Sequence, residues 1–178
     1  MLGCRIRRFL SGFLLLGALI IGIAFALGVL NPPQAQAAIQ RLEEAPGQTV
    51  YQSRQMARDQ WGKHWQIIAF KRLYPDGNNR LELRLIGFPD VPEIDRTQPL
   101  VLTDAFGGTL MANPSDEAPP EPNVGQYDLR SLLSKLVPEI PWRMTVQTLN
   151  LEGIERDGIK LPLSPLWIQE WHRLDAFH

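Results

Sequence analysis

The chain has 178 residues, of which 18 are basic and 19 acidic, so its formal net charge is −1. No cluster of basic residues follows Arg8, and the composition therefore does not favour a nucleic-acid-binding surface. The one cysteine, Cys4, lies near the N-terminus, which excludes disulfides, thiolate metal sites and a cysteine nucleophile from the rest of the chain.

The first 37 residues are typical of an export signal. Arg5, Arg7 and Arg8 precede an uncharged apolar run, Phe9–Leu30, and two prolines follow it. A basic start followed by an apolar core is the usual pattern of a secretory signal. Ala35-Gln36-Ala37 then has the small-x-small pattern of a cleavage site, so we expect cleavage before Ala38.

A retained membrane anchor is the alternative to cleavage. As a helix, residues 9–30 would be ~33 Å long, enough to cross a hydrocarbon core of ~30 Å. Because positive charges stay on the cytoplasmic side, both readings place the rest of the chain outside the cytoplasm. We therefore expect one extracytoplasmic domain over residues 38–178, either released or tethered by the anchor.

Residues 38–178 are numerous enough to bury a hydrophobic core as a single domain. Without Arg5, Arg7 and Arg8 the basic residues number 15 against 19 acidic ones, a formal charge of about −4. No second apolar segment in the sequence approaches the length that spans a membrane.

Alternating and β-branched patterns predict strands in the first half of this domain. The Pro46-Gly47 turn leads into a strand over Thr49–Ala57, and a second strand covers His64–Leu73. Asp59-Gln60-Trp61-Gly62 is a hairpin turn in which Gly62 can take the left-handed conformation. The clearest period of two lies in Arg80–Phe88, where leucines alternate with charged residues.

Further strands and a first helix are predicted in the middle of the chain. Leu100–Thr103 and Thr109–Ala112 flank the turn residues DAFGG and form a hairpin. Residues 113–122 are rich in proline and acids, which favours an extended loop. After this loop Leu129, Leu132, Leu133 and Leu136 follow a helical period, with Asp128 placed to cap the helix.

The C-terminal third predicts another hairpin and a second helix. Strands over Trp142–Leu151 and Ile159–Leu163 are joined by a turn at 155–158. Ser164-Pro165 then starts a helix with one apolar face, formed by Trp167, Ile168, Trp171 and Leu174. The fold class is therefore α+β and β-rich: a curved antiparallel sheet or partly open barrel with two short helices.

The sequence shows no set of residues typical of catalysis or metal binding. His64, His172 and His178 are the only histidines, and none lies in a zinc-binding spacing. No serine has the nucleophile-elbow context, and no glycine-rich phosphate loop follows a strand. We therefore predict no catalytic residue, no cofactor and no metal site.

Aromatic residues are the more informative candidates. Trp65, Trp142, Trp167 and Trp171 lie on apolar faces and are expected in the core. Trp61 lies at the predicted hairpin tip, where an exposed tryptophan is typical of an interaction site; the alternative is that it folds back over the sheet. Phe88 and Tyr127 are two further exposed candidates for an interface.

Several separated segments of the chain resemble one family. These segments are EEAPGQTVYQSR, WQIIAFKR, LRLIGFP, NVGQYDL and IQEW. They are similar to an uncharacterised family of exported proteins found in cyanobacteria, a domain of unknown function, over about Ala38 to Trp171. The resemblance implies the periplasm or the thylakoid lumen, and it carries over no catalytic residue.

Together these observations favour a non-catalytic accessory or assembly-support protein that docks on a membrane complex, such as a photosynthetic one. One alternative is a β-barrel that holds a small apolar ligand, a lipid or a pigment. Another is a hydrolase assembled from distant residues, with His64 or His172 as its base.

Overall fold

The computed structural model describes residues 39–117, 119, 121–149 and 158–178. These residues belong to one compact unit that spans Ala37–His178. Within this part of the chain, no helix is both long enough and apolar enough to cross a membrane.

The predicted export signal lies outside the described residues. This applies to Arg5, Arg7, Arg8 and the apolar run, and also to the cleavage-site residues Ala35, Ala37 and Ala38. Most of the predicted turn at 155–158 lies outside them as well, with Gly158 as its one described residue.

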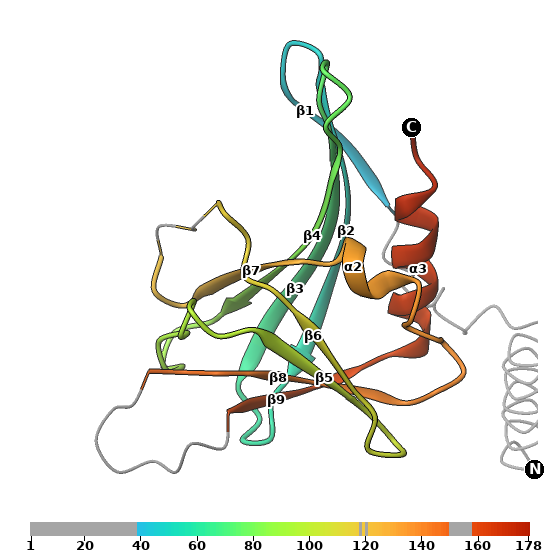
Figure 1. The fold of residues 1–178 in the computed structure, drawn as a ribbon. Helices are drawn as coiled ribbons and strands as arrows, with labels where there is room; N and C mark the ends of the chain where they lie inside the picture. Colours follow the sequence, from blue (N-terminus) through green and yellow to red (C-terminus); the bar gives the residue numbers. More distant parts are fainter. Residues whose placement is uncertain (1–38, 118, 120, 150–157) are drawn as a thin grey trace, which may run out of the picture. The chain divides into compact units, whose positions relative to one another are not determined.

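Strands dominate the described residues, and two short helices accompany them. With the labels of Figure 1, the elements are β1 (Gln40–Ala45), β2 (Gln48–Arg58), β3 (His64–Leu73), β4 (Arg80–Gly87), β5 (Leu100–Asp104), β6 (Thr109–Ala112), β7 (Val124–Asp128), α2 (Arg130–Leu133), β8 (Trp142–Val146), β9 (Ile159–Leu163) and α3 (Pro165–Asp175).

The strands form two antiparallel sheets. The first has the order β1-β2-β3-β4-β7 and the second the order β6-β5-β8-β9. In the first sheet β2 and β3 make a long hairpin, with Arg58 opposite His64 and Thr49 opposite Leu73. Figure 1 shows the first sheet as long, curved strands and the second as shorter strands that cross beneath them. The sheets do not close into a barrel.

One hydrophobic core joins the two sheets. The first sheet contributes residues that recur every second position, such as Leu81, Leu83 and Leu85 on β4, each at most 1% exposed. The second sheet contributes Leu102 and Met144, among others. Because the side chains of a strand alternate between its faces, this period of two is what makes one face of each sheet apolar.

Helix α3 covers one side of this core. Ser164 caps its first turn by accepting a hydrogen bond from the N–H of Leu166, and Pro165 is its first residue. Ile168, Trp171 and Leu174 are completely buried against the core.

Polar contacts fix α3 on the first sheet. Near the middle of the helix, the carboxylate of Glu170 accepts hydrogen bonds from Ser53 Oγ at 2.6 Å and from Gln55 Nε2 at 2.8 Å. At its end, the buried ammonium of Lys71 forms an ion pair with Asp175 at 3.2 Å. These contacts therefore fix the position of α3 on β2 and β3.

The predicted fold class is confirmed. A β-rich arrangement of curved antiparallel sheets with two short helices is observed, and β3, β6 and β9 have the predicted bounds. The face of leucines predicted on β4 is buried. The tryptophans expected in the core are buried as well, except that Trp167 is only half-buried.

Two strands were not predicted. The chain before Pro46-Gly47 is itself a strand, β1, although every one of its residues is exposed. Residues 124–128 form β7, which pairs with β4 at the edge of the first sheet. Neither segment has a clear alternation of apolar and polar residues. Strand β1 forms because its backbone pairs with β2 across the Pro46-Gly47 turn, and β7 because its backbone pairs with the distant β4.

The predicted first helix and the predicted strand over Trp142–Leu151 are both shorter in the structure. Of the segment predicted as the first helix, only α2 (Arg130–Leu133) is helical. Asp128 ends β7 and is not the N-cap, although its Oδ1 does accept the N–H of Arg130 at 2.9 Å. The four leucines of the predicted helical face are all buried. Strand β8 ends at Val146.

Candidate functional site

The turn between β2 and β3 is held by one buried carboxylate. Asp59 is 7% exposed, and its Oδ1 accepts hydrogen bonds from the backbone N–H groups of Trp61 and Lys63, both at 2.9 Å. Its Oδ2 accepts the indole N–H of Trp65 at 3.0 Å. Gly62 has a φ of +81°, the left-handed conformation that the turn requires and that glycine adopts without strain.

A second residue ties this turn to the other sheet. The side-chain amide of Gln60 donates to the carbonyl of Gly158 at 3.0 Å, and its oxygen accepts the N–H of Lys160 at 2.7 Å. Both partners lie at the start of β9. The turn is therefore anchored on one side by Asp59 and on the other by Gln60.

Trp61 lies between these two anchored residues and the left-handed glycine. Its side chain is 57% exposed, whereas Trp65, four residues later, has no exposed surface. The predicted exposure of Trp61 is therefore confirmed. Its role in an interaction stays a prediction.

The turn between β5 and β6 repeats the same geometry. Oδ1 of Asp104 accepts the N–H groups of Phe106 and Gly108, both at 2.8 Å. Gly107 has a φ of +88°, which matches Gly62. Phe106 occupies the position of Trp61 and is 85% exposed.

The sequence contains a signal for this equivalence that the sequence analysis did not use. Residues 59–63 are DQWGK and residues 104–108 are DAFGG, so both turns read aspartate, any residue, aromatic, glycine. An aspartate that accepts its own downstream N–H groups is a common turn device. Its repetition with an aromatic residue at the same position makes Phe106 a functional candidate beside Trp61.

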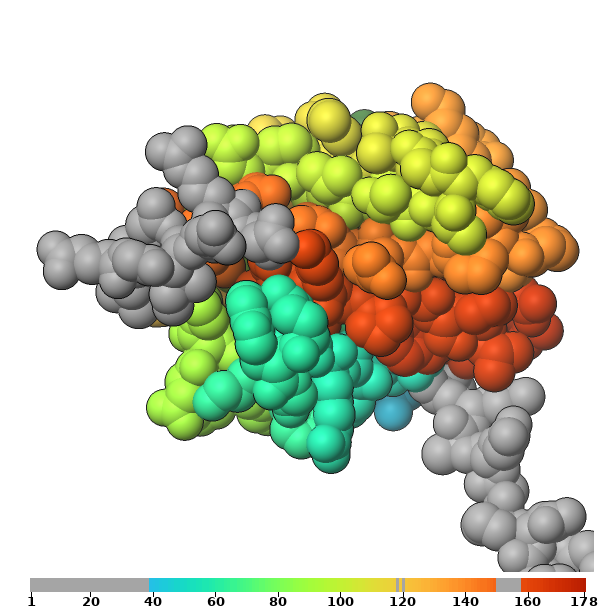
Figure 2. Space-filling view, turned by 90° about the horizontal axis from the view of Figure 1, so that it is seen from below, coloured from blue at the N-terminus to red at the C-terminus, as the bar shows by residue number. Residues whose placement is uncertain are grey.

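Both turns lie at the same end of the domain. In Figure 1 the β2–β3 and β5–β6 connections both form the lower end. Figure 2, seen from below, shows the teal residues of the β2–β3 hairpin and the yellow-green residues of β5 and β6 on this face, on either side of an orange and red band.

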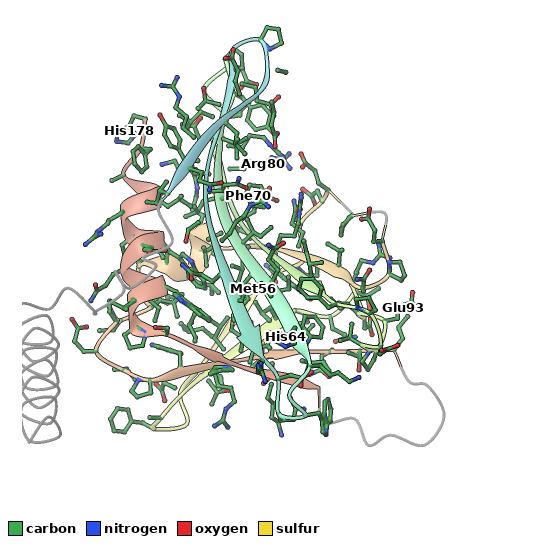
Figure 3. All side chains as sticks on the ribbon, turned by 180° about the vertical axis from the view of Figure 1, so that it is seen from behind. Met56, His64, Phe70, Arg80, Glu93 and His178 are labelled. Atoms are coloured by element: carbon green, nitrogen blue, oxygen red, sulfur yellow. The ribbon has the colours of Figure 1, made fainter. Side chains whose placement is uncertain are left out.

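Phe88 belongs to this end as well. It directly follows β4, its N–H donates to the carbonyl of His64 at 3.2 Å, and it is 41% exposed. Figure 3 labels His64 near the lower end of β3, next to the β2–β3 turn. The predicted exposure of Phe88 is confirmed.

The prediction that Tyr127 is exposed is wrong. Tyr127 is 1% exposed and lies in the core cluster. It was placed beside a loop, but it belongs to strand β7, whose alternation turns Tyr127 inward, while its neighbour Asp128 is part of a surface pocket. Burial, with a smaller contribution from Asp95, raises the pKa of Tyr127 to about 12. It cannot contact a partner in this fold.

Among the described residues, neither of the two histidines predicted as a possible base makes a contact typical of catalysis. His172 Nε2 lies 2.9 Å from the carbonyl oxygen of Leu136, and His64 is exposed with its side chain free of hydrogen bonds. In the part of the chain that the structure describes, neither is hydrogen-bonded to a serine, a threonine or a carboxylate. The hydrolase alternative stays a prediction that these contacts do not support.

The described residues also bear on a metal site and on an apolar ligand. Among the described residues, no group of three histidine, cysteine, aspartate or glutamate side chains could hold a metal ion. Trp65 of the first sheet and Trp171 of α3 are completely buried in the core cluster. A small apolar ligand stays an alternative prediction for this protein.

The geometry thus defines a two-sheet antiparallel β domain with an aromatic-bearing end and no recognisable catalytic centre in its described residues. Residues 37–174 match a family described as protein of unknown function (DUF3122), and the chain belongs to that family. No curated protein and no solved structure matches it.

Proposed function

We propose that this protein is an exported, non-catalytic accessory protein that docks on a larger membrane complex through the end that carries Trp61 and Phe106. The single observation that carries the proposal is the repeated turn. Two aspartate-held turns each present a largely exposed aromatic side chain at the same end of the domain.

The rigidity of the turns supports an interaction role. A binding group that is already held in place loses little conformational entropy when a partner arrives. Trp61 sits between the anchored Asp59 and Gln60 on one side and a left-handed glycine on the other. Aromatic residues with these properties are enriched among the few that dominate interface affinity.

Exposure of these aromatic residues is otherwise costly. The exposed rings of Trp61 and Phe106 contribute little to the free energy of folding. Burial of an aromatic side chain is among the larger favourable contributions from apolar surface in a protein. A partner surface that covers them would recover this free energy. The exposed Phe88 adds apolar area close to Trp61.

The location in this proposal rests on the N-terminal sequence and the family resemblance. Arg5, Arg7, Arg8 and the apolar run 9–30 favour export, and the resemblance to exported cyanobacterial proteins favours the periplasm or the thylakoid lumen. In either compartment, complexes embedded in the membrane offer large protein surfaces. We propose one of these, such as a photosystem or a transporter, as the partner.

The test is affinity purification of the tagged full chain from mildly solubilised native membranes after crosslinking. The wild type is compared with the double variant Trp61→Ala/Phe106→Ala. The control is Leu166→Ala, which removes an exposed apolar side chain (54% exposed) from α3 instead of from the turns.

We expect the wild type and the control to recover the same membrane-complex subunit at near-stoichiometric yield. The double variant should lose that subunit while remaining folded. Recovery of the wild type alone, or equal recovery by all three proteins, would contradict the proposal.

A further inference from the structure

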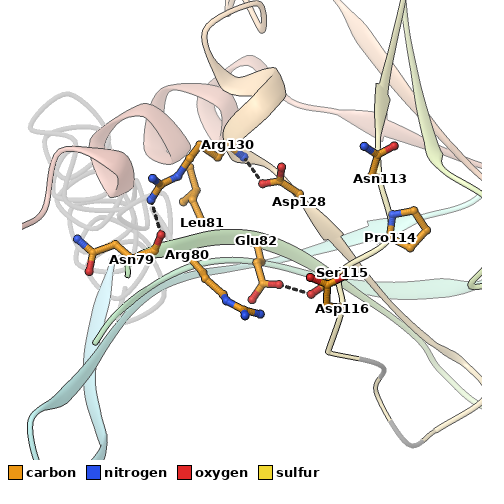
Figure 4. A pocket seen from close by; sticks show the side chains of 10 residues that line it. All are labelled: Asn79, Arg80, Leu81, Glu82, Asn113, Pro114, Ser115, Asp116, Asp128 and Arg130. Atoms are coloured by element: carbon orange, nitrogen blue, oxygen red, sulfur yellow. Dashed lines mark hydrogen bonds between the residues drawn. The ribbon is translucent and has the colours of Figure 1, made fainter. Parts of the chain in front are cut away.

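A polar pocket lies at the opposite end of the first sheet from the two turns. It has a volume of about 400 Å³ and is formed by the start of β4, the segment 113–116 and the junction of β7 with α2. This volume is within the range of sites that bind small molecules. Figure 4 shows the charged and polar side chains around it: Arg80, Glu82, Ser115, Asp116, Asp128 and Arg130.

Glu82 is the unusual member of this pocket. It is 4% exposed, on a strand position that the alternation of β4 assigns to the outer, polar face. Oε1 accepts a hydrogen bond from Ser115 Oγ. Oε2 is buried and has no hydrogen-bond partner in the structure. A buried carboxylate oxygen without a donor is expensive, so its presence needs a reason.

The nearby arginines do not supply the missing donor, because each is engaged elsewhere. Arg80 pairs with Glu117 at 3.3 Å. Arg84 donates two hydrogen bonds to the amide oxygen of Gln126, at 2.9 and 2.7 Å. The guanidinium of Arg130 donates to the carbonyl of Asn79 at 2.6 Å.

The remaining charge in the pocket is negative. Asp116 is exposed on its rim, and Asp128 is the cross-strand partner of Glu82 in the register of β4 and β7. Oδ1 of Asp128 accepts the backbone N–H of Arg130. Among the described residues, the Asp128 carboxylate forms no ion pair. The carboxylates of Glu82, Asp116 and Asp128 therefore outnumber the two arginines that line the pocket, of which Arg80 already pairs with Glu117.

We propose that this pocket binds a primary ammonium group, with Glu82 Oε2 as its buried acceptor and Asp116 and Asp128 as the surrounding charges. An ammonium donates hydrogen bonds and carries a full positive charge, so it can satisfy the orphaned oxygen of Glu82, while the charges of Asp116 and Asp128 attract it to the pocket. The described residues offer no group of three acidic or histidine ligands that could hold a metal ion.

Access to Oε2 requires one side-chain movement. Because this oxygen has almost no exposed surface, a ligand reaches it only after Glu82 rotates about its side-chain bonds. Within the described residues, Ser115 donates the one hydrogen bond that the Glu82 carboxylate accepts, and this bond can break at modest cost once an ammonium replaces it. The ligand is therefore expected to exchange the Ser115 contact for a stronger, charge-assisted one.

The pocket is separate from the proposed docking end. Glu82 is opposite Phe70, six residues along β3 from His64. At ~3.3 Å per residue this is a separation of ~20 Å along the strand. Figure 3 labels Arg80 near the upper end of the sheet and His64 near the lower end. Loss of docking and loss of ammonium binding can thus be observed independently.

The ammonium can come from a free amine or from a lysine side chain of another protein. The probes are n-butylammonium chloride for the first source and Nα-acetyl-lysine methylamide for the second. Each is titrated into the full chain while the backbone amide signals of Ser115 and Asp116 are followed by NMR, with sodium chloride and sodium butyrate at equal ionic strength as controls.

We expect saturable shifts of these two signals with at least one ammonium probe, and none with sodium chloride or butyrate. Glu82→Gln keeps the shape of the side chain but removes its charge, and it should weaken binding by about tenfold or more. The matched control Glu139→Gln, an exposed residue that does not line the pocket, should bind like the wild type. Tighter binding of the lysine probe would indicate a protein lysine, and tighter binding of n-butylammonium a free amine.

Three results would overturn the proposal: no saturable shift with either probe, the same shift with sodium chloride, or unchanged binding by Glu82→Gln. If Glu82→Gln does not fold, the exposed rim variant Asp116→Asn replaces it, with an expected weakening of about twofold to threefold. Unchanged binding by that variant would then count against the proposal.

Discussion

The indole N–H of Trp65 donates a 3.0 Å hydrogen bond to Oδ2 of Asp59, which joins a fully buried tryptophan to a buried carboxylate at the base of the β2–β3 turn. The same carboxylate holds the backbone of the turn through its other oxygen. One side chain thus connects the core of the domain to the conformation of the loop that presents Trp61. In the β5–β6 turn, Asp104 holds the backbone in the same way but has no indole partner.

We expect Asp59→Asn to destabilise the fold by about 1–3 kcal/mol. An asparagine can still accept the backbone N–H groups with its one oxygen, but its NH₂ group cannot accept the indole N–H of Trp65. Urea unfolding measures this loss. The control is Asp104→Asn, which should cost less because that turn has no buried indole bond, and an equal loss in both variants would contradict this account of Asp59.

Trp61→Ala should weaken docking by about 2 kcal/mol, and it should change the free energy of unfolding by no more than about 0.5 kcal/mol. The reason is that Trp61 is 57% exposed and the turn is held by its neighbours instead of by its own side chain. Titration against the recovered partner, together with urea unfolding, checks both halves. A large loss of stability with unchanged affinity would show that Trp61 serves the fold and not an interface.

Stability should fall at high pH because of Tyr127. Burial raises its pKa from 10.0 to about 12, so the folded protein keeps the phenol protonated where the unfolded chain would release the proton. The stabilisation is fully present below pH 10 and is lost as the pH rises from 10 to 12, a change of about 2–3 kcal/mol. Tyr127→Phe has no phenol group at this position to ionise, so the variant should not show this loss.

The comparison of wild type and Tyr127→Phe by urea unfolding at pH 8 and at pH 11 measures the effect. The unfolding free energy of the wild type minus that of Tyr127→Phe should be smaller at pH 11 than at pH 8. An identical pH dependence in both proteins would show that ionisation of Tyr127 is not coupled to unfolding.

Removal of the Glu170 carboxylate should loosen α3. Ser53 has no exposed surface, and its hydroxyl donates to Glu170 at 2.6 Å, so Glu170→Ala leaves a buried donor without its partner. We expect a loss of about 1–3 kcal/mol, because Gln55 Nε2, 3.4 Å from the Ser53 oxygen, is a donor and cannot replace the lost acceptor.

Urea unfolding gives the size of this loss, and faster amide hydrogen exchange in α3 gives its location. Glu139→Ala, at an exposed carboxylate in the α2–β8 connection, is the matched control and should leave both unchanged. Equal exchange in α3 for the wild type and Glu170→Ala would show that this contact does not hold the helix on the first sheet.

We expect the protein isolated from its native membranes to begin at Ala38. The basic residues, the apolar run and Ala35-Gln36-Ala37 together favour cleavage before Ala38. Intact-mass analysis of the purified protein measures this directly. A mass that begins at Ala38 supports the cleaved form, one that retains Met1 supports the anchor, and recovery from the cytosol would contradict both.

Local patterns in the sequence were enough to predict several elements. The period of two in β4, the hydrophobic run of β3 and the Ser164-Pro165 start of α3 each depend on residues that are neighbours along the chain. The turn at Asp59–Gly62 was predictable for the same reason. Its geometry depends on an aspartate and a glycine three residues apart, and so does the exposure of Trp61.

The tertiary structure alone decided the features that depend on residues far apart in sequence. Strand β7 exists because its backbone pairs with β4, some forty residues earlier, and this pairing turns Tyr127 into the core. The alternation of β4 assigns Glu82 to the face opposite the leucines, where it is nevertheless buried and accepts a hydrogen bond from Ser115, 33 residues later. Sheet order and burial follow from which distant backbones meet, and the local alternation of side chains carries no information about that choice.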